Sequence, residues 1–121
     1  MPRDIQKLKL TPQWLETHSN EATQELNRMM DHDPSHLAKA IKSAVINRLD
    51  ITDSLSKIKA KTIVLSGELD KATPPELGEE IAKLIPNTQH ILLAKVAHSI
   101  PLESPQSVLD VVHNLLGNQC I

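Results

Sequence analysis

The stretch of sequence that decides the fold is residues 62–117, which read TIVLSGELDKATPPELGEEIAKLIPNTQHILLAKVAHSIPLESPQSVLDVVHNLLG. It opens on a β-branched apolar run at 62–65 that does not alternate with polar residues, which is typical of a buried strand. Apolar residues at helical spacing cover about 75–84, and a second apolar run at 91–93 predicts another strand. A last amphipathic helix is predicted to begin at Pro105. The order β-α-β-α predicts an α/β fold with two or so parallel strands and a right-handed crossover.

The first half of the chain is predicted to be helical. A Thr-Pro pair opens an apolar stripe over 12–30, and an Asp-Pro pair opens a second one over 34–49. A short helical turn is expected at 52–57, and residues 1–11 show no clear periodicity. This half carries no obvious chemistry of its own.

Composition excludes several classes of protein. The 121 residues include 13 basic and 15 acidic side chains, a formal net charge of −2, so we expect neither nucleic acid nor a membrane surface as partner. No apolar run approaches the roughly 18–20 residues of a membrane span, and the charged N-terminus lacks a signal-peptide core. Cys120 is the single cysteine and Trp14 the single aromatic residue. We therefore expect a cytoplasmic protein with an aliphatic core and no internal disulfide.

Two polar residues follow the predicted strands. Asp70 comes shortly after the first strand, and His98 comes shortly after the second. Because functional residues of open parallel sheets gather at the carboxyl ends of the strands, we expect these side chains to meet at one edge of the sheet. A carboxylate there can hold an imidazole in the tautomer that accepts a proton from a nucleophile. In hydrolases with a strand-to-helix nucleophile elbow the chain order is nucleophile, acid, histidine, and Asp70 before His98 agrees with the last two members.

The second half of the chain resembles the C-terminal part of α/β-hydrolases, most closely the 3-oxoadipate enol-lactonase type. Four sequence features carry the resemblance, which covers residues 50–117 well: Gly67 to Asp70, Thr73-Pro74-Pro75, Ala97-His98 and Glu103-Ser104-Pro105. It implies that Asp70 is the catalytic acid, that His98 is the catalytic base, and that no cofactor or metal takes part. It also implies a helical cap-like segment at 1–49 and a C-terminal hydrolase core segment at 50–121.

The sequence departs from this family where the nucleophile is concerned. The family's serine lies in Gly-x-Ser-x-Gly, and none of the glycines of this chain, Gly67, Gly78 and Gly117, frames a serine in that way. Ser66 and Ser99 lie near the expected site, but neither is on such an elbow, and a hydrogen-bonding role in a loop is the better interpretation. We therefore predict that this chain contains no nucleophile and cannot complete a triad alone.

The remaining candidate residues have ordinary structural interpretations. His32 and His36 have a spacing that can bind zinc on one helix, but Pro34 interrupts the stretch, which favours a helix cap with exposed imidazoles. Cys120 is better explained as a terminal thiol than as a nucleophile, and Trp14 as a packing residue. Three other histidines are predicted to be surface residues: His18, His90 and His113.

Three hypotheses about function remain open. In the first, the chain is part of a serine-type hydrolase of small ester or enol-lactone substrates, and a complementary hydrolase segment supplies the serine. In the second, it is a non-catalytic, hydrolase-derived interaction domain that self-associates, since a half-sheet exposes a strand edge and an apolar face. In the third, it is a truncated reading frame.

Overall fold

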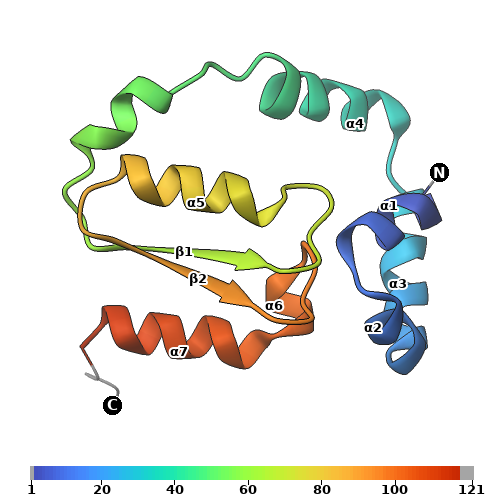
Figure 1. The fold of residues 1–121 in the computed structure, drawn as a ribbon. Coiled ribbons are helices and arrows are strands. Elements are labelled where there is room, and N and C mark those ends of the chain that lie inside the picture. The colour runs from blue at the N-terminus through green and yellow to red at the C-terminus, as the bar shows by residue number, and fades with distance from the viewer. Residues whose placement is uncertain (1, 118–121) are drawn as a thin grey trace.

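We analysed a computed structural model of the protein, which describes residues 2–117 (Figure 1). Its elements in chain order are α1 (Pro2–Lys9), α2 (Pro12–Thr17), α3 (Ser19–Met30), α4 (Pro34–Ile41), the π-helical turn η1 (Lys42–Ile46), the 3-10 helix η2 (Thr52–Lys57), β1 (Thr62–Gly67), α5 (Pro75–Leu84), β2 (Thr88–Leu93), α6 (Ile100–Glu103) and α7 (Pro105–Leu115). The fold is α/β, as the sequence predicted.

The sheet consists of β1 and β2, which pair in parallel from Thr62 opposite Thr88 to Gly67 opposite Leu93. α5 connects the two strands and packs against both, while α7 lies on the other side of the sheet (Figure 1). The parallel β-α-β unit predicted from the pattern of apolar runs is therefore confirmed.

Three helices, α1, α2 and α3, gather beyond the carboxyl ends of the strands, next to α6 (Figure 1). No helix is expected over residues 1–11, where the sequence shows no clear apolar periodicity, but the structure forms α1 there. The buried side chain of Gln6 explains the difference, since its amide donates to the Ala22 carbonyl of α3 at 2.6 Å. A helix this short is marginal alone and owes its stability to such tertiary contacts.

The two long helices predicted for the first half are interrupted in the structure. The first, over 12–30, breaks at His18, whose backbone has φ −122° and ψ 44°. The His18 ring stacks on Trp14 with centroids 4.6 Å apart, and the Thr17 hydroxyl donates to the Gln13 carbonyl at 2.9 Å. Side-chain contacts of this kind to the backbone compete with helix continuation. The second helix, over 34–49, changes to a π-helical turn after Ile41.

The chain is unusually open for its size. A compact monomer of 13.4 kDa is expected to expose about 6,500 Å², whereas this chain exposes 9261 Å². Among residues 2–117 the buried apolar side chains are few: Leu10, Ala22, Ile85, Val96 and Ala97. Many large apolar residues are exposed instead, on η1 and the segment after it and along α7, including Ile46, Leu49, Leu109 and Leu116. Within the same residues, no helix is long and apolar enough to cross a membrane.

Gly67 is the point where the end of β1 passes close to the loop that follows β2. We predict that Gly67→Ala lowers the free energy of unfolding by about 2–3 kcal/mol, because a methyl group there would overlap the carbonyl oxygens of Val96 and Ala97. Urea unfolding of wild type and variant measures the difference.

Gly117→Ala is the matched control for this substitution. Gly117 has φ +67° and open space around it, so the control carries only the backbone cost of about 1 kcal/mol. Equal losses in the two variants would contradict the close approach at Gly67.

Candidate active site

Two loops at the carboxyl ends of the strands form the candidate site. Backbone hydrogen bonds tie the loop after β1 to the end of β2 and the loop that follows it. The Glu68 N–H donates to the Leu93 carbonyl and the Leu69 N–H to the Val96 carbonyl, both at 2.9 Å. The Asp70 N–H donates to the Gly67 carbonyl at 3.1 Å and closes a tight turn. The parallel pairing thus continues past the strands and sets the two loops side by side.

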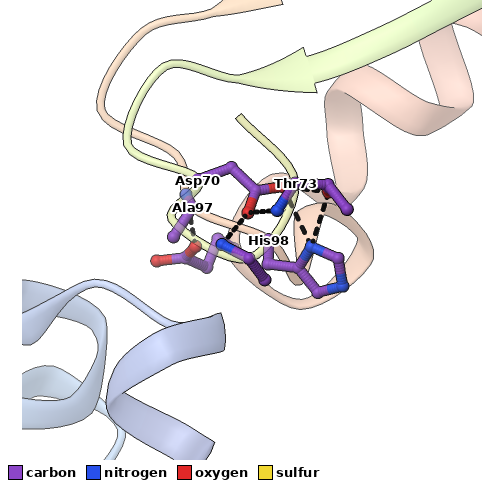
Figure 2. Close-up of polar contacts among 6 residues, drawn as sticks. Asp70, Thr73, Ala97 and His98 are labelled. Carbon is purple, nitrogen blue, oxygen red and sulfur yellow. Dashed lines mark hydrogen bonds and ion pairs between the residues drawn. The ribbon is translucent and has the colours of Figure 1, made fainter. Parts of the chain in front are cut away.

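The Asp70 carboxylate is buried and accepts four hydrogen bonds (Figure 2). Its Oδ1 accepts the backbone N–H groups of Ala72 and Thr73, both at 2.9 Å. Its Oδ2 accepts the Thr73 hydroxyl at 2.9 Å and lies 2.9 Å from Nδ1 of His98. The structure therefore brings together the two residues that the sequence singled out.

Opposing influences act on the pKa of Asp70. Burial is the largest single one and acts to raise the pKa. The backbone N–H of Thr73, the side chain of His98 and the Thr73 hydroxyl all favour the charged form, and together they hold the pKa below its usual value. The carboxylate is therefore ionised at neutral pH and able to accept from an imidazole.

His98 is held through one ring nitrogen. Its Nδ1 lies 2.9 Å from Asp70 Oδ2 and 3.1 Å from the Thr73 hydroxyl oxygen, while about a third of the side chain remains exposed. Since the carboxylate only accepts and the hydroxyl donates to that carboxylate, the arrangement favours a proton on Nδ1. The lone pair of a neutral ring then lies on Nε2, where a general base needs it.

Thr73 and Glu103 are two further residues of the site, and neither has a role that the sequence pattern predicts. Thr73 donates two hydrogen bonds to Asp70 and also contacts His98 (Figure 2). The Glu103 carboxylate accepts the Ala97 N–H at 2.8 Å. Both were visible in the sequence as parts of the Thr-Pro-Pro and Glu-x-Pro features. Their hydrogen bonds depend on loop conformation, which spacing alone does not reveal.

The other candidates lie elsewhere. Ser66 is on β1 rather than in a loop, and its hydroxyl is 2.9 Å from Nε2 of His90 on β2, which is half-buried rather than on the surface. The pair packs against Gly78 of α5, where a Cβ would meet both side chains. The backbone N–H of Ser99 donates to the Lys9 carbonyl at 2.9 Å.

His32 and His36 are exposed, and the part of the chain that the structure describes contains no group of three or more His, Cys, Asp or Glu residues that could hold a metal ion. His18 is exposed and His113 is half-buried. Trp14 is half-buried, and its indole N–H donates to the Leu102 carbonyl of α6 at 3.2 Å. Cys120 lies outside the described residues.

Comparison with known proteins identifies the fold. An esterase from Thermogutta terrifontis matches 97% of this chain at a TM-score of 0.85 and 24% identity, over 43% of its own length. The enol-lactonase from Burkholderia xenovorans LB400 matches 96% at a TM-score of 0.85 and 20% identity, over 44% of its length. An α/β-hydrolase from a sediment metagenome of the Mar Chica lagoon, Morocco, matches 82% at a TM-score of 0.63 and 24% identity, over 45% of its length.

The chain thus has the fold of part of an α/β-hydrolase, as the sequence resemblance predicted. It spans less than half the length of the solved structures that it matches. No protein-family model matches the sequence, and neither does any curated protein.

Acid titration tests the hydrogen-bonded state of Asp70. Its folded-state pKa lies below the unfolded-state value of about 3.9. The ionised carboxylate therefore stabilises the fold above that value, and the contribution is lost as pH falls through the lowered folded-state pKa. We predict that Asp70→Asn, which removes this titration, loses less stability than wild type between about pH 5 and pH 2, by on the order of 1 kcal/mol.

Urea unfolding at a series of pH values measures this difference. Asp53→Asn, at an exposed position of η2, is the matched control for the removal of one carboxylate. Parallel stability curves for wild type and Asp70→Asn would contradict the assignment.

Proposed function

We propose that this chain supplies the catalytic acid and base of a serine-type hydrolase that acts on ester or enol-lactone bonds. The observation that carries the proposal is the 2.9 Å contact between Asp70 Oδ2 and His98 Nδ1 at the carboxyl ends of two parallel strands. The α/β-hydrolase fold of the chain supports it, because the residues of an acid–histidine pair belong at that edge of the sheet.

The proposed mechanism gives each residue one task. A serine hydroxyl from another segment attacks the substrate carbonyl, and Nε2 of His98 takes the hydroxyl proton as the C–O bond forms. The leaving-group oxygen takes that proton as its bond to the acyl carbon breaks, and His98 next takes a proton from water as the water attacks the acyl-enzyme. His98 then returns this proton to the serine oxygen as the bond between that oxygen and the acyl carbon breaks, which releases the acid. Asp70 keeps the ring in the required tautomer and stabilises the imidazolium. This sequence of steps uses no metal and no organic cofactor.

A complementary hydrolase segment is the partner that the proposal requires. The exposed area is about 2,800 Å² larger than that of a compact monomer of this mass. Within the described residues β1 pairs only with β2, which leaves its other side open to a further strand. These features support association with a segment that bears the nucleophile. The cytoplasmic location proposed with this activity depends on composition alone.

The alternative is a non-catalytic, hydrolase-derived interaction domain. The exposed apolar side chains of η1 and α7 favour it, because surfaces of that kind on a small chain mark sites of association. In this case the apolar faces are covered by a second copy of the chain, and the acid–histidine pair has no reaction to perform.

Reconstitution tests the catalytic proposal. The chain is mixed with the segment of the Thermogutta terrifontis esterase that the structural match does not cover, and hydrolysis of a p-nitrophenyl ester is followed. We predict that the pair hydrolyses the ester, and that His98→Ala or Asp70→Asn lowers kcat by on the order of 10³–10⁴-fold, because either change removes the oriented base.

His36→Ala, an exposed imidazole of α4, is the matched control and is expected to keep full activity. A complex that forms but shows no hydrolysis, or hydrolysis that survives His98→Ala, would contradict the catalytic proposal. The first of these outcomes favours the interaction domain.

The state of the chain in solution is a separate prediction. Because so much apolar surface is exposed, we expect the purified chain alone to self-associate in a concentration-dependent manner. Size-exclusion chromatography with light scattering measures the mass, and a compact monomer at all concentrations would count against both the catalytic and the interaction proposals.

A further inference from the structure

We infer that Glu103 is a positioning residue for His98. Its carboxylate holds the loop that carries His98 (residues 94–99, the histidine loop) to the chain at residues 9–11 (the N-terminal segment) through Thr11. Glu103 ends α6 and lies five residues after His98 in the sequence. The role that this inference gives to His98 rests on the proposed function, whereas the placement of the loop does not.

The Glu103 carboxylate joins two segments that are far apart in the sequence. Its Oε2 accepts the backbone N–H of Ala97 at 2.8 Å. Its Oε1 accepts the backbone N–H of Thr11 at 2.9 Å and the Thr11 hydroxyl as well. Ala97 and Thr11 are both buried, so these charge-assisted bonds are poorly accessible to competing water.

The residue on the other side of His98 is fastened to the same segment. The Ser99 N–H donates to the Lys9 carbonyl at 2.9 Å. Both neighbours of His98 are therefore held, Ala97 through Glu103 and Ser99 directly. The backbone of the histidine loop has little freedom to rotate the imidazole away from Asp70.

The N-terminal segment is itself well anchored. Leu10 is the most deeply buried large side chain, with 2% of its surface exposed. The Thr11 hydroxyl caps α2 by accepting the Trp14 N–H at 3.2 Å, and the Trp14 indole N–H donates to the Leu102 carbonyl of α6 at 3.2 Å. The segment thus provides a fixed support, and Glu103 connects that support to the loop.

Glu103→Gln removes the connection with little change in shape. The amide nitrogen of glutamine donates and cannot accept, so at least one of the bonds to Ala97 and Thr11 is lost. We expect the exchange rate of the Ala97 amide hydrogen to rise about tenfold or more, and the fraction of neutral His98 with its proton on Nδ1 to fall. Both are measured by NMR of the full chain at mildly alkaline pH, the second from ¹⁵N shifts of the labelled imidazole.

Three further variants sharpen the test. Glu80→Gln, at an exposed position of α5, removes the same charge elsewhere and is expected to change neither signal. Thr11→Val removes the hydroxyl but keeps the backbone donor, so we expect a smaller change in the same direction. Thr11→Ser keeps the hydroxyl and is expected to restore both signals.

The outcomes distinguish positioning from general stability. The inference would be overturned if the Ala97 amide exchange rate and the His98 tautomer fraction both stayed at their wild-type values in Glu103→Gln and in Thr11→Val. A lowered Tm with an unchanged His98 tautomer would overturn it too, because that pattern describes a merely structural contact. If both signals move while the reconstituted enzyme is inactive, the positioning role stands and the catalytic proposal fails.

Discussion

The parallel pairing of β1 with β2 is the constraint on which the rest of the site depends. The register places Gly67 opposite Leu93, and two backbone hydrogen bonds continue the pairing into the loops, at Glu68 and Leu69. Asp70 is the next residue along. The side chain of Gly67 is restricted to a hydrogen atom because the loop after β2 crosses so closely at this point. Strand register therefore decides which residue faces His98, and a one-residue slip would turn Asp70 away from it.

Electrostatics at the site reflect competition between burial and hydrogen bonding. A buried carboxylate without partners would take up a proton and lose its ability to orient an imidazole. The turn after Asp70 prevents this, since Ala72 and Thr73 present their N–H groups to Oδ1 and leave Oδ2 for the Thr73 hydroxyl and His98. Thr73 thereby acts on both members of the pair. The nearby N–H and hydroxyl groups of Ala72 and Thr73 favour the charged form of Asp70. The charged carboxylate can then accept a hydrogen bond from His98, which is 28 residues away in the sequence.

The sequence predicted the parts of the structure that depend on local pattern. The β-α-β order, the placement of Asp70 and His98 after the strands and the helix from Pro105 were all readable from apolar spacing and turn residues. The break at His18 and the helix α1 were not, because they depend on ring stacking with Trp14 and on the contact from Gln6 to Ala22. The connection from Glu103 to Thr11 spans 92 residues, a separation at which no single-sequence pattern identifies a partner.

The acid–histidine pair is well ordered although much of the chain is exposed, because hydrogen bonds fix the pair whereas burial of apolar surface would be needed to close the rest. Backbone and side-chain hydrogen bonds among three loop regions fix the acid–histidine pair, and these bonds need only two strands and the N-terminal segment. Burial of a large apolar area needs more packed elements than a two-stranded sheet and its helices supply here, and residues such as Leu49 and Leu109 stay exposed. The geometry of the Asp70–His98 pair and the burial of apolar area thus depend on different parts of this fold. The chain holds a hydrogen-bonded acid–histidine pair, while much of its apolar surface on η1 and α7 stays exposed.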